Sequence, residues 1–147
     1  MKMWTQIVTI LGASVLVAAC GAAPALADKS LMPDVVLMQS ESTQEAYRFA
    51  VAHPDDLTTV PCYCGCVGLG HRNNRDCYLK PESEPDALVF DDHALGCEIC
   101  AEITHLTIEL KGAGASPGAI RTAVDARFAD RGPGTDTPFP AQTMTVN

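Results

Sequence analysis

A mostly apolar run lies near the start of the chain, from Ile7 to Ala19. Lys2 supplies a positive charge before this stretch, and small residues follow it. A run of this length is too short to span a bilayer as a stable helix, so the pattern predicts a secretory signal. The chain is therefore expected to be exported.

Two cleavage sites compete for the end of this signal. Val17-Ala18-Ala19-Cys20 resembles the lipobox of bacterial lipoproteins, in which the cysteine is lipidated and becomes the new N-terminus. Ala25-Leu26-Ala27 fits an ordinary small-x-small site that would discard Cys20. The lipobox is favoured because it follows the apolar run directly. It predicts a lipoprotein of the bacterial cell envelope, held on the periplasmic or extracellular face of a membrane by a lipid on Cys20.

Beyond the leader, apolar residues recur with the spacing of short helices. Ser42 and Glu45 form a capping box that opens one helix, and His53-Pro54 ends it. Another is expected from about His93 or Gly96 to Leu110 or Lys111, and a third from Ser116-Pro117 to about Asp130. The fold class predicted is mainly α, a small irregular helical domain of three to four helices organised around a Cys/His metal-binding loop.

The segments between these helices lack a regular period. Residues 57–61 should be extended, because Pro61 disfavours a helical conformation at the preceding residue. Residues 61–78 contain too many glycines and asparagines for regular structure, and residues 81–92 are acidic and interrupted by prolines. A long loop is therefore expected before the second helix.

The chain divides into four parts around a single domain. Residues 1–19 are the lipoprotein-type signal peptide (with the alternative cleavage after residue 27), and residues 20–41 are a flexible tether. Residues 42–131 form the metal-binding domain, which is long enough for one modest core. Residues 132–147 are rich in proline and threonine and are expected to be a loose C-terminal tail.

Charge narrows the range of partners. The 147-residue chain carries a formal net charge of -8, and loss of Lys2 with the leader makes the remainder more acidic still. An acidic surface repels nucleic acid and accumulates cations, so no nucleic-acid partner is expected. The sequence contains no Gly-rich phosphate loop, Ser-His-Asp set or metalloprotease helix, and the chain is not expected to be an enzyme.

Cysteine usage carries the strongest chemical signal. The chain has seven cysteines, and six remain if Cys20 is lipidated or removed. An even number in an exported protein first suggests disulfides. Cys62, Cys64 and Cys66 alternate with single residues, however, and a Cys-x-Cys ring is short and strained. Thiolates that bridge soft metal ions explain this crowding directly.

A second group of candidate ligands lies further along the chain. Cys97 and Cys100 would stand one turn apart on one face of a helix. His93 joins the same face if the helix begins early enough, although Gly96 makes that start doubtful. His71 and Cys77 lie between the two groups.

Together these candidates outnumber the ligands that one ion needs. The set spans 39 residues and comprises six thiols and two imidazoles: Cys62, Cys64, Cys66, His71, Cys77, His93, Cys97 and Cys100. One tetrahedral zinc takes four ligands, so the set indicates two ions, a thiolate-bridged cluster, or some ligands that are only structural. The excess of thiols favours copper(I), with zinc as the alternative.

The motif itself resembles that of a known family. Pro61-Cys62-Tyr63-Cys64-Gly65-Cys66, then Gly70-His71, Asp76-Cys77-Tyr78, His93 and Cys97-x-x-Cys100, is similar to the bacterial proteins named for the PCYCGC motif. The resemblance covers roughly residues 42–130. Many of these proteins are predicted lipoproteins, which agrees with the lipobox, but the function of the family was long unknown. The resemblance therefore adds little about the metal.

The leading functional hypothesis is an exported soft-metal-binding protein that buffers or stores copper(I), or transfers it to or from a metal-donor or acceptor protein. One alternative is a structural or interaction domain stapled by zinc or by disulfides. Another is a CxxC thiol oxidoreductase, against which stand the absence of a strand-helix-strand pattern and the acidic residues before Cys97. We expect the loop from Cys62 to Cys77 to fold over the N-terminal end of the Cys97 helix.

Overall fold

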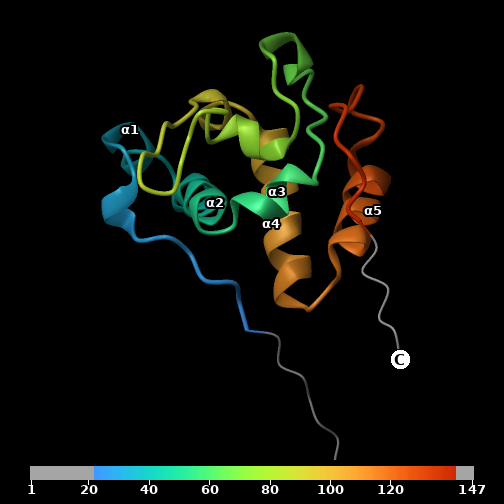
Figure 1. Ribbon diagram of the computed structural model, residues 1–147, viewed down its shortest axis with the longest axis horizontal. Coiled ribbons are helices and arrows are strands. Elements are labelled where there is room, and N and C mark those ends of the chain that lie inside the picture. The colour runs from blue at the N-terminus through green and yellow to red at the C-terminus, as the bar shows by residue number, and fades with distance from the viewer. Residues whose placement is uncertain (1–21, 142–147) are drawn as a thin grey trace, which may run out of the picture.

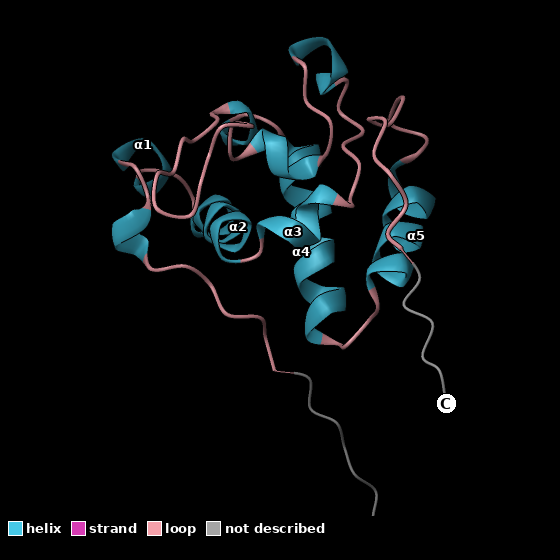
Figure 2. Ribbon diagram, in the orientation of Figure 1, coloured by secondary structure: helices cyan, strands magenta, loops and turns pink. Residues whose placement is uncertain are grey.

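The computed structural model describes residues 22–141, and their regular structure is helical (Figures 1 and 2). Five α-helices occur: α1 (Asp34–Leu37), α2 (Glu41–Ala52), α3 (Pro54–Thr58), α4 (Glu98–Gly112) and α5 (Pro117–Phe128). Within residues 22–141 there is no strand, only isolated bridges between Leu79 and Phe90 and between Glu84 and Ala87. The prediction of a mainly helical fold is confirmed. The expected signal peptide and Cys20 lie outside the described residues.

Helix α4 is the central element of the domain and packs against both α2 and α5 (Figure 1). Cys97 is its N-cap, and Gly114, with φ of 80°, takes the left-handed conformation that turns the chain towards α5. Helix α5 begins as the sequence predicted, because the Ser116 hydroxyl accepts a hydrogen bond from the Ala119 N–H and Pro117 occupies the first turn.

Two predictions of helix boundaries were wrong. Helix α2 is capped by Ser40, whose hydroxyl accepts a hydrogen bond from the Thr43 N–H at 3.2 Å, so it starts before the predicted cap at Ser42. The stretch expected to be extended begins instead as the short helix α3. Pro54 fits the first turn of α3 because its missing N–H needs no partner there, and two aspartates in that turn suit the helix dipole.

The core has two parts, on either side of α4. One is built around Tyr47 and Phe49 of α2 and includes the buried cysteines. The other joins Val60 and Ile103 to the apolar face of α5 at Val124 and Phe128. Four of the cysteines (Cys62, Cys66, Cys77 and Cys100) therefore lie inside the hydrophobic core.

The segment expected to be a flexible tether packs onto the domain in its second half. Met32 and Val36 are buried, with 5% and 1% of their surface exposed. Ala27 exchanges hydrogen bonds with Arg48 of α2, through its N–H at 3.2 Å and its carbonyl at 2.6 Å. A helical turn over residues 29–31 (Lys29–Leu31) and helix α1 supply the local structure. The few apolar residues of this stretch are thus sufficient to bind it to the core.

The expected loose tail is also packed over its described part. Thr135 bonds to both backbone groups of Cys62: its N–H donates to the Cys62 carbonyl at 3.0 Å, and its hydroxyl accepts from the Cys62 N–H at 2.9 Å. Thr137 donates to the Arg72 carbonyl at 2.7 Å. Residues 132–141 therefore hold the backbone of the cysteine loop through hydrogen bonds. Among the described residues no helix is both long and apolar enough to cross a membrane.

Candidate metal centre

The cysteine loop folds into two short helical turns that turn its sulfurs inward. Gly65 and Gly70, with φ of 81° and 84°, flank a 3-10 turn over residues 66–69 (Cys66–Leu69), and no residue with a Cβ takes these conformations easily. A second 3-10 turn, Asn74–Cys77, is capped by the Asn73 side chain and delivers Cys77 to the core. Cys62 and Cys66 are buried, whereas Cys64 is partly exposed.

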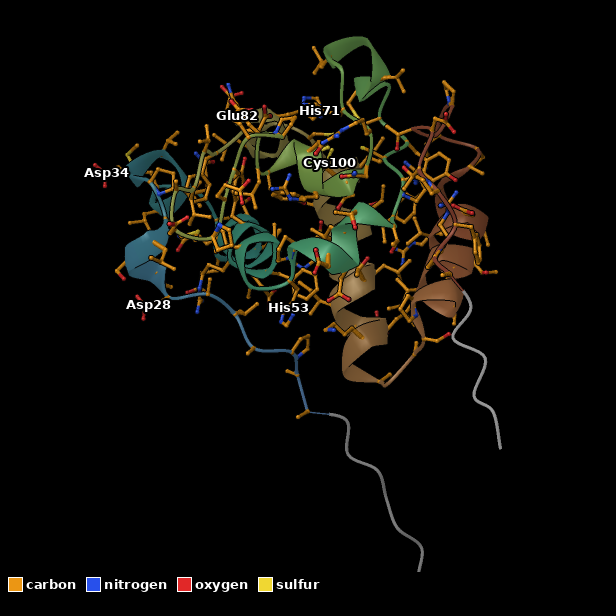
Figure 3. All side chains as sticks on the ribbon, in the orientation of Figure 1. Asp28, Asp34, His53, His71, Glu82 and Cys100 are labelled. Carbon is orange, nitrogen blue, oxygen red and sulfur yellow. The ribbon has the colours of Figure 1, made fainter. Side chains whose placement is uncertain are left out.

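The sulfurs of this loop meet those at the start of α4, where Cys100 lies (labelled in Figure 3). Cys62 Sγ lies 3.2 Å from Cys64 Sγ and 3.4 Å from Cys100 Sγ, and Cys64 Sγ lies 3.5 Å from Cys100 Sγ. Cys97 Sγ accepts from Cys100 Sγ at 3.1 Å. The loop thus folds over the N-terminal end of this helix, as the sequence predicted. The six cysteines within the described residues are free thiols.

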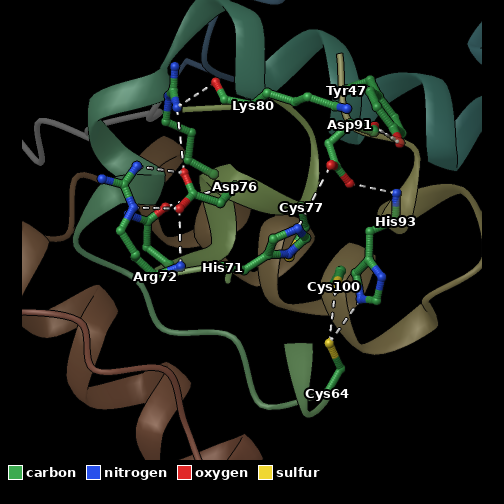
Figure 4. Close-up of polar contacts among 12 residues, drawn as sticks. Tyr47, Cys64, His71, Arg72, Asp76, Cys77, Lys80, Asp91, His93 and Cys100 are labelled. Carbon is green, nitrogen blue, oxygen red and sulfur yellow. Dashed lines mark hydrogen bonds and ion pairs between the residues drawn. The ribbon is translucent and has the colours of Figure 1, made fainter. Parts of the chain in front are cut away.

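Two imidazoles border the sulfurs (Figure 4). His93 Nε2 lies 3.2 Å from Cys64 Sγ, and His71 Nδ1 lies 3.5 Å from Cys77 Sγ. The two rings meet edge to face, with centroids 5.2 Å apart. His93 does not belong to the Cys97 helix, since it lies in a separate 3-10 turn that ends before Gly96. It reaches the site from outside the helix.

Asp91 holds both histidine segments. Its Oδ1 accepts from the His93 backbone N–H at 2.9 Å, and its Oδ2 lies 3.8 Å from His71 Nε2. The Asp91 carbonyl in turn accepts a hydrogen bond from the Tyr47 hydroxyl at 2.8 Å. A carboxylate near the outer nitrogen of a histidine is a common arrangement around metal ligands, although at 3.8 Å Asp91 does not hydrogen-bond to the His71 ring.

Seven of the eight predicted ligands fall into sets whose ligand atoms all lie within 4.8 Å of one another. The sets are Cys64/His93/Cys97/Cys100, Cys62/Cys64/Cys66, Cys62/Cys77/Cys100 and Cys66/Cys77/His93. His71 contacts Cys77 but joins none of these sets. Because the sets overlap, the seven residues form one continuous cluster that could hold a metal ion.

The thiols share protons within the cluster. Hydrogen bonds from Cys100, Cys66 and Cys77 lower the pKa of Cys62. The reverse holds for its neighbours: the bond to Cys62 raises the pKa of Cys66 to about 11, and burial raises the pKa of Cys64. Hydrogen bonding within the cluster likewise raises the pKa of Cys77 and of Cys100. Without metal, one thiolate is therefore stabilised by protonated neighbours, and a metal ion that binds here must displace those protons.

With this geometry in place, comparison with known proteins identifies the family. Residues 18–140 match the model of a family described as a protein of unknown function with PCYCGC motif. The chain belongs to this PCYCGC family. No curated protein and no solved structure matches the chain. The cluster that the PCYCGC motif builds is therefore the feature of the molecule that indicates its function.

Sequence reasoning missed a buried polar network behind the cluster. Thr104 Oγ1 lies 2.7 Å from both Asn74 Oδ1 and the Tyr78 hydroxyl oxygen, and all three residues are fully buried. The Tyr78 hydroxyl donates to the Cys100 carbonyl at 2.9 Å, and Asn74 Nδ2 donates to the same carbonyl at 3.4 Å. The network ties the Asn74–Cys77 turn to the helix turn that carries Cys100. Asp76-Cys77-Tyr78 was visible in the sequence, and helical spacing placed Thr104 on the Cys97 face of the helix, but no local pattern revealed the hydrogen bonds between them.

Proposed function

We propose that this PCYCGC protein binds copper(I) and buffers it, stores it or transfers it at the bacterial cell envelope. The observation that supports this most strongly is the convergence of Cys62, Cys66 and Cys77, which are buried and of which any two have sulfurs within 4.8 Å of each other. Copper(I) accepts two or three thiolates readily and needs no oxygen ligand. A buried thiolate trio also protects the ion from water and oxidants.

Zinc is the second candidate, and a different part of the cluster favours it. Cys64, His93, Cys97 and Cys100 form a Cys3His set, and this ligand combination is common in structural zinc sites. In that case the ion would link the cysteine loop to α4 and stabilise the fold, and the protein would act through another surface. Competition between the two metals distinguishes these functions.

We propose no catalytic role for the Cys97–Cys100 pair. Cys97 is the N-cap of α4, the position from which CxxC oxidoreductases attack. Its partner Cys100 is fully buried, however, and contacts Cys62 and Cys64 as well as Cys97. A resolving thiol surrounded by three others fits a metal cluster better than a two-thiol redox cycle. Failure to reduce a disulfide substrate is the expected result.

Export and anchoring belong to the same proposal. The apolar run before Cys20 and the lipobox around it support a lipid anchor, and the acidic charge suits a protein that collects cations. Mass analysis of the mature protein tests this, because a lipidated N-terminal Cys20 differs from a chain cut after Ala27 by both acyl groups and residues.

Copper binding is tested by competition with a copper(I) chelator under reducing conditions. The wild-type protein should withdraw copper from bicinchoninate, and a variant with serine at Cys62, Cys64 and Cys66 should not. His53→Gln is a matched control, since His53 is an imidazole outside the cluster that bonds to the Ala25 carbonyl. If the serine variant binds as tightly as the His53 variant, the cluster is not the copper site.

A further inference from the structure

The cluster has a buried part and a partly exposed part. Cys62, Cys66 and Cys77 are at most 2% exposed. The sulfurs of any two of them lie within 4.8 Å of each other, because each pair occurs together in one of the four sets. They form an inner trio. Cys64, His93 and Cys97 are partly exposed, and with buried Cys100 they form an outer tetrad. The cluster therefore contains two adjacent ligand groups that share no member.

The outer tetrad opens to solvent at Cys97. A cleft of about 390 Å³ lies between the start of α2 and the first turns of α4, and its lining includes Ser42, Cys97, Ala101, Glu102 and His105. Cys97 is the one member of the cluster in that lining. A ligand that enters this cleft thus meets Cys97 first.

The walls of this cleft carry polar side chains among apolar ones. His105 is held on α4 by two contacts to α2: its Nε2 lies 2.8 Å from Ser42 Oγ, and its Nδ1 lies 3.5 Å from Glu45 Oε2. Glu98 and Glu102 add carboxylates to the lining. Such a cleft attracts a cation and leaves space for an incoming sulfur.

We propose that the cluster holds two copper(I) ions and exchanges one of them through this cleft at Cys97, while the ion of the inner trio is retained. This inference rests on the proposed copper function and extends it to the route of transfer. The exchange partner is a cysteine thiolate of a donor or acceptor protein. Its sulfur forms a bond to the outer copper ion as the Cu–Cys97 bond breaks, the released Cys97 thiolate takes up a proton, and copper remains in the +1 state throughout.

This route is tested by following the transfer of copper(I) from fully loaded protein to bicinchoninate in a stopped-flow instrument. Wild-type protein should show two phases of equal amplitude, a fast one from the outer tetrad and a slow one from the inner trio. Ala101→Phe fills the cleft and should slow the fast phase by about tenfold or more, which corresponds to an increase of about 1.4 kcal/mol in the barrier. The slow phase and the equilibrium affinity should not change.

Ala126→Phe is the matched control, because Ala126 is exposed on α5 and lines a different cleft. Glu102→Trp is a second occluding variant at an exposed position, in case Phe at position 101 disturbs the helix. Equal fast-phase rates in both occluding variants and in the Ala126 variant would overturn the route through the cleft. A single phase with one released copper would overturn the two-ion assignment. Failure to bind copper at all would instead reject the proposed function.

Discussion

Thr104 provides the most specific structural prediction, because one buried hydroxyl links the cysteine loop to α4. Thr104→Val keeps the shape of the side chain, so it leaves no cavity, but it removes the contacts of 2.7 Å to Asn74 and Tyr78. Tyr78 keeps its hydrogen bond to the Cys100 carbonyl, whereas Asn74 Oδ1 is left buried without this partner. Thr104 has one hydroxyl proton, and Tyr78 already donates its own to Cys100, so the hydroxyl satisfies one of the two partners at a time. Its loss leaves one buried polar atom without a donor, which costs about 1–3 kcal/mol.

The expected loss in the free energy of unfolding is therefore about 1–3 kcal/mol, or a fall in Tm of roughly 4–12 °C for a domain of this size. The assay is thermal unfolding of the reduced, metal-free protein followed by circular dichroism. Thr122→Val is the control, since it makes the same substitution at an exposed position where the hydroxyl bonds only to the Gly118 carbonyl. If the two variants unfold within about 0.5 kcal/mol of each other, the network does not stabilise the fold.

Three further predictions concern protons and metal. First, metal affinity measured by chelator competition should rise with pH between about 6 and 9. The pKa values of Cys64, Cys66, Cys77 and Cys100 are raised, and these thiols must lose their protons before they can bind metal. A flat profile would contradict ligation by these thiols. Second, the stability of the metal-free fold should fall at alkaline pH. A thiol whose pKa is raised on folding stabilises the fold fully below its unfolded pKa of 9.0, and this contribution is lost as the pH rises towards the folded pKa, which is about 11 for Cys66. The lowered pKa of Cys62 offsets only one of these groups, so urea titrations should show falling stability over this range, and no change would contradict the assignment. Third, trypsin should cut after Arg72 and Arg75 more slowly once metal is added, as judged by mass spectrometry of the fragments. Equal cutting in both states would argue against a metal-organised loop.

The sequence predicted the parts of the fold that local rules determine. Ser116-Pro117 opened a helix because a cap and an N-terminal proline act within one turn, and Gly114 ended the previous one for an equally local reason. The sequence also predicted that the cysteine loop lies over the start of α4, because thiols expected to bind the same ions have to lie close together.

The remaining features depend on contacts between distant residues. Ser40 and Ser42 are both acceptable caps in the sequence, and the structure uses Ser42 for a bond to His105 of α4 instead. Thr135 looked like part of a loose tail, because nothing local reveals that it pairs with the backbone of Cys62. His93 was expected to reach the site by continuing the Cys97 helix, yet it does so from a separate turn that Asp91 holds.

The binding of copper by the PCYCGC cluster is tested most directly by elemental analysis of the mature protein. The protein should be purified from its native envelope without added metal, and its free thiols should be counted in parallel. The proposed function predicts bound copper together with thiols that are protected until the copper is removed. Bound zinc would favour the structural role of the Cys3His set. Absence of metal together with absence of free thiols would show a disulfide scaffold and contradict the central claim.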